Sequence, residues 1–443
     1  MSQLKRALPS GPLRGSVRAP GDKSVSHRSA ILGAMARGLT EVRGGLEGAD
    51  IHSTLAAVEA FGAKVERGDG VWRIRGTGIK GFRSPEVDVD CGNAGTGVRL
   101  LMGAAAGYKL QARFTGDSSL SSRPMARVMA PLREMGAEFA STTLESGGKD
   151  RLPATLRSSG TLSAISHTPS VASAQVKSAI LLAGLHADGP TSVLERTATR
   201  DHTENMLRAF GATVRAEPRA EGTDVIVEPL MNPLQGTAIQ VPGDPSSAAF
   251  AVVAALITPG SDVLVEGVLL NPRRTALLDA LHAMGGSVEV ENAREEGGER
   301  VGDIRARHSE LKGAAIDPAR AADMIDEYPI LAVAAAFADG ETVMDGIHEL
   351  RVKESDRIAA TVALLRGAGV HVEDRPDGMT VMGADSVRGG NTATTHHDHR
   401  IAMSALVLGL ASRDGVAVDD ASMIATSYPD FFAHFQSLGA EFA

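Results

Sequence analysis

Residues 326–340 read DEYPILAVAAAFADG, and this stretch decides how the chain folds. All residues from Ile330 to Phe337 are apolar, so a helix formed by them has no polar face and has to be buried. An acid before the first turn caps a helix, and a glycine after the last turn ends one. Asp326 and Gly340 stand at those two places, so the stretch predicts a short buried helix with a polar start.

The same pattern occurs six times along the chain. Polar clusters begin the apolar stretches at residues 22–24, 95–96, 173–175, 244–246, 326–329 and 398–400, and glycines end them at positions 38, 107, 189, 260, 340 and 415. This spacing, about 70 to 80 residues, indicates an internal repeat. A second helix, ending in a further glycine at positions 62, 136, 211, 285, 369 and 439, follows each time. Helix N-termini attract anions, so six converging starts would bind a polyanionic small molecule.

The chain is also a duplication of two halves. Pro20-Gly-Asp-Lys-Ser24 returns as Pro242-Gly-Asp-Pro-Ser246, 222 residues later. We therefore expect an α/β protein of two domains with three repeats each. One domain is residues 20–242, and the other is residues 1–19 with 243–443, because residues 1–19 contain a strand-like stretch that can pair with the C-terminal half.

Composition narrows the class of protein. The net charge of −9 and the aromatic content of 3% argue against a nucleic-acid partner. The single cysteine, Cys91, excludes an intrachain disulfide and is typical of a reducing compartment. No apolar run suggests a signal peptide or a membrane span. We expect a cytoplasmic protein without a membrane partner.

Cations gather where helices are predicted to begin. Lys23 with His27, and Ser24 with Arg28, are each one turn apart at the start of the first helix, so each pair shares a face. The second copy of this motif lacks these cations. A capped, solvated helix end would have the same composition, but recurrence at other helix starts favours an anion site.

Three further segments carry the same signal. Residues 91–99, CGNAGTGVR, match neither a dinucleotide fingerprint nor a phosphate-binding Walker loop, so a plain turn and a backbone anion site stay open. Residues 121–125 and 200–204 each begin a second helix. Lys353 and Arg357 are predicted on one face of a third, beside Glu354. Because the helix dipole disfavours cations there, they point to an anionic ligand.

Two groups of residues have alternative interpretations. Asp326 is either an N-cap or, with Glu354, half of a proton-transfer pair. His396-His-Asp-His399 has the composition of a metal cluster but not the spacing of one. We expect no metal and no cofactor.

Seven motifs in order resemble the 5-enolpyruvylshikimate-3-phosphate (EPSP) synthase family, in its class II branch. They are PGDKSVSHR (20–28), GNAGTGVR (92–99), SSRPM (121–125), SAQVKSA (173–179), RVKESDR (351–357), DHRIAM (398–403) and SYPDFF (427–432). The resemblance implies an inside-out α/β barrel of six βαββαβ repeats, with helix N-termini facing an active-site cleft between two domains. It also implies a monomer without a metal.

The implied reaction transfers the enolpyruvyl group of phosphoenolpyruvate (PEP) to the 5-hydroxyl of shikimate 3-phosphate through a tetrahedral ketal. By matching position, shikimate 3-phosphate would be held by Lys23, Ser24, Arg28, Ser173, Ala174, Gln175, Arg200, Asp326 and Lys353. PEP would be held by Lys23, Gly95, Arg123, Gln175, Arg357 and Arg400. The catalytic residues would be Lys23 between the substrates, Asp326 as the base for the hydroxyl and Glu354 as the acid for the methylene.

One position departs from the family pattern, and two other functions compete. Many members have a lysine where this chain has Thr426, so one PEP-side cation is missing. Gly95 keeps the small residue that the resemblance links to inhibition by glyphosate. The alternatives are the sister transferase that acts on UDP-N-acetylglucosamine, and a non-catalytic anion-binding repeat protein. The sister family usually has a reactive loop cysteine, which residues 116–123 lack.

Overall fold

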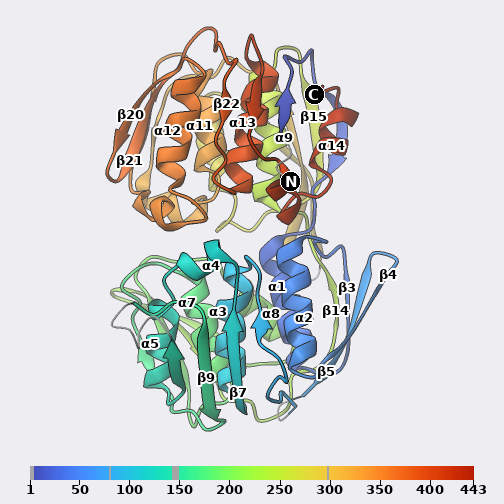
Figure 1. The fold of residues 1–443 in the computed structure, drawn as a ribbon, viewed down its shortest axis with the longest axis vertical. Helices are drawn as coiled ribbons and strands as arrows, with labels where there is room; N and C mark the ends of the chain where they lie inside the picture. The colour runs from blue at the N-terminus through green and yellow to red at the C-terminus, as the bar shows by residue number, and fades with distance from the viewer. Residues whose placement is uncertain (1–3, 79–80, 142–148, 297–298) are drawn as a thin grey trace. The chain divides into compact units, whose positions relative to one another are not determined.

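The computed structural model describes residues 4–78, 81–141, 149–296 and 299–443. The chain divides into two compact units (Figure 1). We call residues Gly21–Val241 the N-unit, and Met1–Pro20 with Pro242–Ala443 the C-unit.

The N-unit combines helices with three sheets among its described residues. Its helices are α1 (Lys23–Met35), α2 (Ala49–Ala60), α3 (Gly95–Ala106), α4 (Ser118–Ser122), α5 (Ala126–Glu134), α7 (Ala174–Gly184) and α8 (His202–Ala209). The sheet orders are β14-β3-β5-β4, β6-β7-β9-β8 and β10-β11-β13-β12. The strands are β3 (Arg37–Arg43), β4 (Lys64–Gly68), β5 (Val71–Thr77), β6 (Val89–Asp90), β7 (Lys109–Thr115), β8 (Glu138–Ser141), β9 (Ala154–Ser159), β10 (Ser166–His167), β11 (Thr191–Glu195), β12 (Val214–Arg219), β13 (Gly222–Val227) and β14 (Ala238–Gln240).

The C-unit repeats this plan. Its helices are α9 (Pro245–Ile257), α10 (Ala276–Ala283), η1 (Pro318–Asp323), α11 (Tyr328–Ala336), η2 (His348–Val352), α12 (Arg357–Gly367), α13 (His399–Ala411), η3 (Ser422–Thr426) and α14 (Phe431–Ser437). The sheet orders are β16-β17-β15-β2, β18-β19-β21-β20 and β1-β23-β22. The strands are β1 (Lys5–Ala7), β2 (Arg14–Arg18), β15 (Asp262–Leu269), β16 (Ser287–Glu296), β17 (Glu299–Arg307), β18 (Ala315–Ile316), β19 (Glu341–Met344), β20 (His371–Arg375), β21 (Gly378–Met382), β22 (Thr392–Ala393) and β23 (Val416–Val418).

The α/β class is confirmed, but the order of elements within a repeat is not βαββαβ. The second and fifth repeats run strand, buried helix, strand, second helix and hairpin, as in β18-α11-β19-α12-β20-β21. In this repeat β18 is parallel to β19, and β20 is antiparallel to β21. Parallel neighbours need a crossover helix between them, whereas a hairpin needs only a turn, which explains this order. Closure into a barrel stays a prediction.

The predicted duplication is visible in the element bounds. Helix α1 spans Lys23–Met35 and helix α9 spans Pro245–Ile257, so both ends are displaced by 222 residues. The side chains of Asp22 and Asp244 cap the two helices by accepting backbone N–H groups. The two copies therefore share one local structure.

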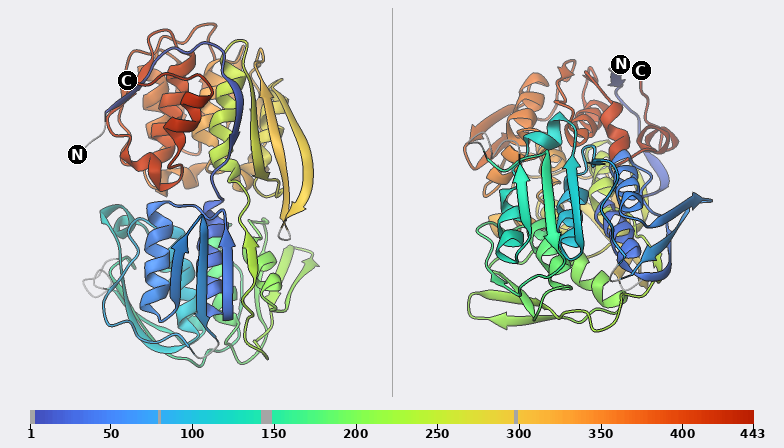
Figure 2. Two further views of the ribbon diagram at one scale, coloured as in Figure 1. Left: turned by 90° about the vertical axis from the view of Figure 1, so that its right-hand side faces the viewer. Right: turned by 60° about the horizontal axis from the view of Figure 1, so that its bottom comes forward.

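The N-terminal segment pairs with the C-terminal half, as predicted. Strand β1 is antiparallel to β23, and β2 is parallel to β15. Figure 2 shows this blue segment lying against the later part of the chain. The second of these pairings supplies the fourth strand of the sheet next to α9.

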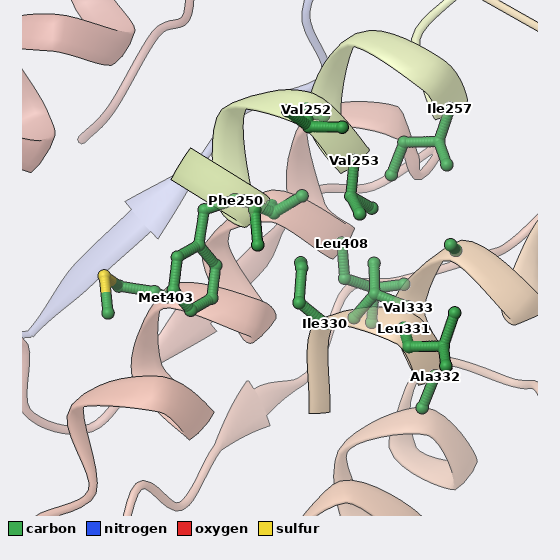
Figure 3. Close-up of a cluster of buried hydrophobic side chains, with 14 of the residues drawn as sticks. Phe250, Val252, Val253, Ile257, Ile330, Leu331, Ala332, Val333, Met403 and Leu408 are labelled. Carbon is green, nitrogen blue, oxygen red and sulfur yellow. The ribbon is translucent and has the colours of Figure 1, made fainter. Parts of the chain in front are cut away.

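Three buried helices form the centre of the C-unit. Phe250 on α9, Leu331 on α11 and Met403 on α13 meet in one apolar cluster (Figure 3). Each is at most 1% exposed, and full burial of such a side chain stabilises the fold by about 1.5–3 kcal/mol. The stretch at 326–340 therefore packs as its composition predicts.

The second helix of every repeat ends at the predicted glycine. The six glycines have positive φ angles between +83° and +109°, the left-handed conformation of a helix C-cap. They are Gly62, Gly136, Gly211, Gly285, Gly369 and Gly439. Close packing needs glycine elsewhere too, because a Cβ on Gly103 of α3 would lie 2.3 Å from the Ala179 carbonyl oxygen of α7.

Candidate functional site

The starts of the three buried helices of the N-unit lie together. Gln175, in the first turn of α7, donates from Nε2 to Thr96 Oγ1 on α3 at 2.9 Å. Arg28 on α1 donates from Nη2 to Ser178 Oγ on α7 at 2.9 Å. A Cβ added to Gly97 on α3 would lie 3.4 Å from His27 Nδ1 on α1. The predicted convergence of helix starts is therefore confirmed within this unit.

Lys23 and His27 share one face of α1, as predicted, and that face meets α2. The Lys23 ammonium forms an ion pair with Asp50, and His27 Nδ1 lies 2.8 Å from Thr54 Oγ1. His27 is completely buried rather than displayed at the helix mouth. Burial, with Lys23 and Arg28 nearby, holds the pKa of His27 well below its usual value. His27 is therefore neutral and structural, while Lys23 stays partly exposed.

Arg123 and Gly95 lie against each other at the start of α3. Arg123 ends α4 in an extended conformation, because the residue before a proline avoids helical geometry. It therefore lies in the turn before α5, not inside the predicted second helix. Its guanidinium contacts the Asn93 side chain and donates to Ser119 Oγ at 3.2 Å. A Cβ on Gly95 would lie 2.8 Å from Arg123 Nη1.

The remaining predicted residues of the N-unit lie at two helix starts. Ser173 caps α7 by accepting the Val176 N–H at 3.4 Å, and Ala174 is the first helical residue. Arg200 is half-buried just before Asp201, the N-cap of α8. All predicted anion-binding residues of this unit therefore stand at or next to helix N-termini.

The starts of the C-unit's buried helices converge as well. Ser246 at the start of α9 contacts the Glu327 carboxylate, and Glu327 is the N-cap of α11. Arg400 on α13 donates from Nη1 to the Asp326 carbonyl oxygen at 3.3 Å. Arg400 Nη1 also lies 3.8 Å from Glu327 Oε1.

Arg357 is the centre of this second cluster. Its side chain is 1% exposed and contacts three carboxylates. Nη1 lies 3.0 Å from Asp326 Oδ1, Nη2 lies 2.6 Å from Glu354 Oε2, and Nε donates to Asp398 Oδ2 at 2.7 Å. Burial alone would lower the pKa of Arg357, but the three carboxylates outweigh it and raise that pKa. The two predicted proton-transfer carboxylates thus share one guanidinium.

Lys353 also contacts Asp326, from a position outside helix α12. Its Nζ lies 3.7 Å from Asp326 Oδ1. The expectation that Lys353 and Arg357 share a helix face is wrong, because Asp356 caps α12 and the helix begins at Arg357. Lys353 lies in the loop after η2. Lys353 from the loop and Arg357 from the first turn of α12 both contact Asp326, whereas the two cations had been predicted on one face of a single helix.

Asp398 is buried and contacts two of the three arginines that the resemblance assigns to PEP, Arg357 and Arg400. It accepts from Arg357 Nε, and its other oxygen caps α13 by accepting the Arg400 backbone N–H at 2.9 Å. Burial on its own would raise the pKa of Asp398, as Glu354 also does, but Arg357, helped by His399, outweighs them and lowers that pKa. The carboxylate is therefore ionised at neutral pH and fixes the geometry of the cluster.

The other predicted features are simpler. Cys91 is buried, and burial raises the pKa of its thiol to about 12, so it is an unreactive packing residue. Thr426 donates to the Met423 carbonyl at the end of η3.

In the described part of the chain, no group of His, Cys, Asp and Glu side chains is arranged to hold a metal ion. No helix within the described ranges is long and apolar enough to cross a membrane.

Sequence reasoning missed three residues that shape these clusters. Arg99 donates from Nη1 to Gln175 Oε1 at 2.9 Å and so orients that side chain. Arg99 is the last residue of the 92–99 motif, and its place in that motif could have identified it from the sequence. Asp398 begins the 398–403 motif and could have been found in the same way. Asp50 had no signal, because only the packing of α2 on α1 shows that it reaches Lys23.

Comparison with known proteins gives a consistent result. The sequence profile described as EPSP synthase (3-phosphoshikimate 1-carboxyvinyltransferase) matches residues 8–435. A 3-phosphoshikimate 1-carboxyvinyltransferase of Phenylobacterium zucineum is 59% identical, with 97% of this chain and 94% of that protein covered. The Caulobacter vibrioides enzyme of the same name is 56% identical, covering 99% and 98%.

Solved structures agree with the sequences. The EPSP synthase of Acinetobacter baumannii has a TM-score of 0.87 and 42% identity, and the match covers 100% of both chains. The enolpyruvyl transferase NikO of Streptomyces tendae has a TM-score of 0.76 at 17% identity, over 99% of this chain and 98% of that one. At that identity the second likeness concerns the fold alone.

Proposed function

The chain belongs to the EPSP synthase family and has the activity of a 3-phosphoshikimate 1-carboxyvinyltransferase of the shikimate pathway; from this premise we propose which residues carry out each step. The enolpyruvyl group passes from PEP to the 5-hydroxyl of shikimate 3-phosphate. Addition to C2 of PEP gives a tetrahedral ketal, and loss of phosphate from it gives the product.

The N-unit binds the anionic groups of the substrates. Ser24, Arg28, Ser173, Ala174, Gln175 and Arg200 hold shikimate 3-phosphate, and Lys23 lies between the two substrates. The support is that helix starts and cations occur together here, since backbone N–H groups and the helix dipole both favour anions. Charge-assisted hydrogen bonds to phosphate are worth about 1.5–3 kcal/mol each.

PEP is held by Lys23, Gly95, Arg123, Gln175, Arg357 and Arg400. The contact of Gly95 with Arg123 supports this part of the proposal, because a larger residue at position 95 would displace the guanidinium. Glyphosate is the inhibitor that we propose for the same group of residues. No lysine stands at position 426, so the arginines carry the charge complementarity on this side.

The C-unit supplies the proton transfers. Asp326 accepts the proton of the 5-hydroxyl, Glu354 delivers a proton to the PEP methylene, and Lys353 helps to hold shikimate 3-phosphate. The observation that carries this assignment is the single Arg357 guanidinium, which lies 3.0 Å from Asp326 and 2.6 Å from Glu354. Two carboxylates held by one rigid group keep a fixed separation, as a base and an acid that act on neighbouring atoms require.

Phosphate release from PEP tests the function. We expect release that depends on shikimate 3-phosphate. Release that depends instead on UDP-N-acetylglucosamine would identify the sister transferase, and no release with either acceptor would identify a non-catalytic binding protein.

Asp326→Asn tests the assignment of the base. It should lower kcat by roughly 10²–10⁴ while the KM values change little, because Asn keeps the shape but cannot accept the proton. Asp345→Asn is the matched control, since Asp345 is half-exposed in the same unit and pairs with Arg375. Turnover by Asp326→Asn equal to that of the control would remove Asp326 as the base.

A cytoplasmic location and a monomeric state stay predictions from the sequence.

A further inference from the structure

The Arg28 guanidinium is held by hydroxyl groups from two other helices. Nε donates to Thr203 Oγ1 on α8 at 2.7 Å, and Nη2 donates to Ser178 Oγ on α7 at 2.9 Å. Nη1 donates to the Ser24 carbonyl oxygen on its own helix at 3.0 Å. Arg28, Ser178 and Thr203 are each at most 3% exposed. Contacts at all three nitrogens fix both the plane and the direction of the guanidinium.

These three acceptors are uncharged, in contrast to those of Arg357. A hydroxyl or a carbonyl orients a guanidinium without itself neutralising the charge, whereas the three carboxylates around Arg357 oppose its charge. These hydroxyl and carbonyl contacts therefore orient Arg28 without themselves neutralising its charge.

The two hydroxyls are themselves held in register. Ser178 Oγ on α7 lies 2.6 Å from Thr203 Oγ1 on α8. The next residues along form a second link, because Lys177 Nζ on α7 lies 2.5 Å from Glu204 Oε1 on α8. Lys177 also donates to Glu195 Oε2 at 2.9 Å. All of these groups are buried. Two adjacent links between α7 and α8 prevent the helices from sliding, so the Thr203 hydroxyl stays opposite Arg28.

We propose that Thr203 and Ser178 are positioning residues that aim Arg28 at shikimate 3-phosphate and so determine the affinity for that substrate. The inference rests on the proposed role of Arg28. Neither hydroxyl has to touch the substrate. Loss of the Thr203 hydroxyl frees Nε of Arg28 to turn, and a guanidinium that can turn binds a phosphate or carboxylate less well.

Thr203→Val tests the proposal, because valine has nearly the same shape and removes only the hydroxyl. We expect KM for shikimate 3-phosphate to rise about tenfold or more, because the substitution removes one hydrogen bond that orients Arg28. KM for PEP should change less than about twofold. Thr203→Ser keeps the hydroxyl and should restore the KM to within about twofold of the wild-type value.

Two further variants keep the test decisive. Thr191→Val is the matched control, because Thr191 is buried in the same unit and its hydroxyl has no hydrogen-bond partner among the described residues. Ser178→Ala keeps a good helix former and should raise the same KM even if Thr203→Val fails to fold.

Three results would overturn the proposal: an unchanged KM for shikimate 3-phosphate in folded Thr203→Val and Ser178→Ala, equal rises in both KM values, or an equal rise in Thr191→Val. Failure of the proposed function gives a different result. In that case the wild-type protein itself would release no phosphate from PEP with shikimate 3-phosphate.

Discussion

His186 makes the stability of the N-unit depend on pH. It follows α7, and its ring lies 4.6 Å from the Tyr108 ring, centroid to centroid. Burial lowers the pKa of His186 from 6.5 to about 4. Its Nε2 has no hydrogen-bond partner among the described residues, so the folded protein offers the protonated ring little compensation. The folded state therefore resists protonation that the unfolded chain accepts.

The sign and size follow from that difference. Because the folded pKa is lower, the stabilisation is fully present above pH 6.5 and is lost as the pH falls towards 4. Each pH unit in this window is worth up to about 1.4 kcal/mol, so the window as a whole is worth on the order of 3 kcal/mol. His186→Leu removes this titration, and its stability should fall less steeply with decreasing pH.

Urea unfolding followed by the fluorescence of Trp72 measures the effect. Trp72 is the only tryptophan of the chain and is buried in β5 of the same unit. Between pH 7.5 and 4.5 the slope of unfolding free energy against pH should differ between wild type and His186→Leu by about one proton. Tyr108→Phe is the control for packing, since it alters the ring contact with His186 without removing a group that titrates in this range. Parallel curves for wild type and His186→Leu would refute the reasoning.

Two further substitutions test the clusters. Gly95→Ala should raise KM for PEP more than KM for shikimate 3-phosphate, because the new Cβ would lie 2.8 Å from Arg123 Nη1 and must displace it. Steady-state kinetics in which the two KM values rise equally would contradict this. Lys177→Met leaves Glu195 and Glu204 buried without their ammonium group and should lower the free energy of unfolding at pH 7 by about 3–5 kcal/mol. Burial raises the pKa of Glu204, so that loss should shrink at pH 5, and a loss that is independent of pH would count against the mechanism.

The fold was largely predictable because its signals are local. An apolar stretch such as Ile330–Phe337 can only be buried, and a glycine such as Gly369 ends a helix by its own backbone conformation. The order of strands in a repeat was not predictable from such signals. Strands of two residues, such as β6 and β18, are too short to show a period, and only their partners define them.

The candidate site was predictable as a set of residues but not as a set of contacts. Motif positions placed Arg28 and Arg357 at helix starts correctly. That Arg28 meets the hydroxyls of Ser178 and Thr203, and Arg357 the carboxylate of Asp398, depends on segments distant in sequence, such as α8 and the loop before α13. Periodicity does not show which side chains meet across such distances.

The pairing of β1 and β2 with the C-unit has a consequence for how the protein is made. Residues 21–241 are continuous, so this body can complete its own sheets while the ribosome is still translating the rest. Strands β1 and β2 come before this body in the sequence, yet β2 must wait for β15 and β1 for β23, and both partners are translated after residue 241. Strand β1 therefore stays without its sheet partner longer than β2 does, and the C-unit can complete its sheets only after the N-unit has been translated.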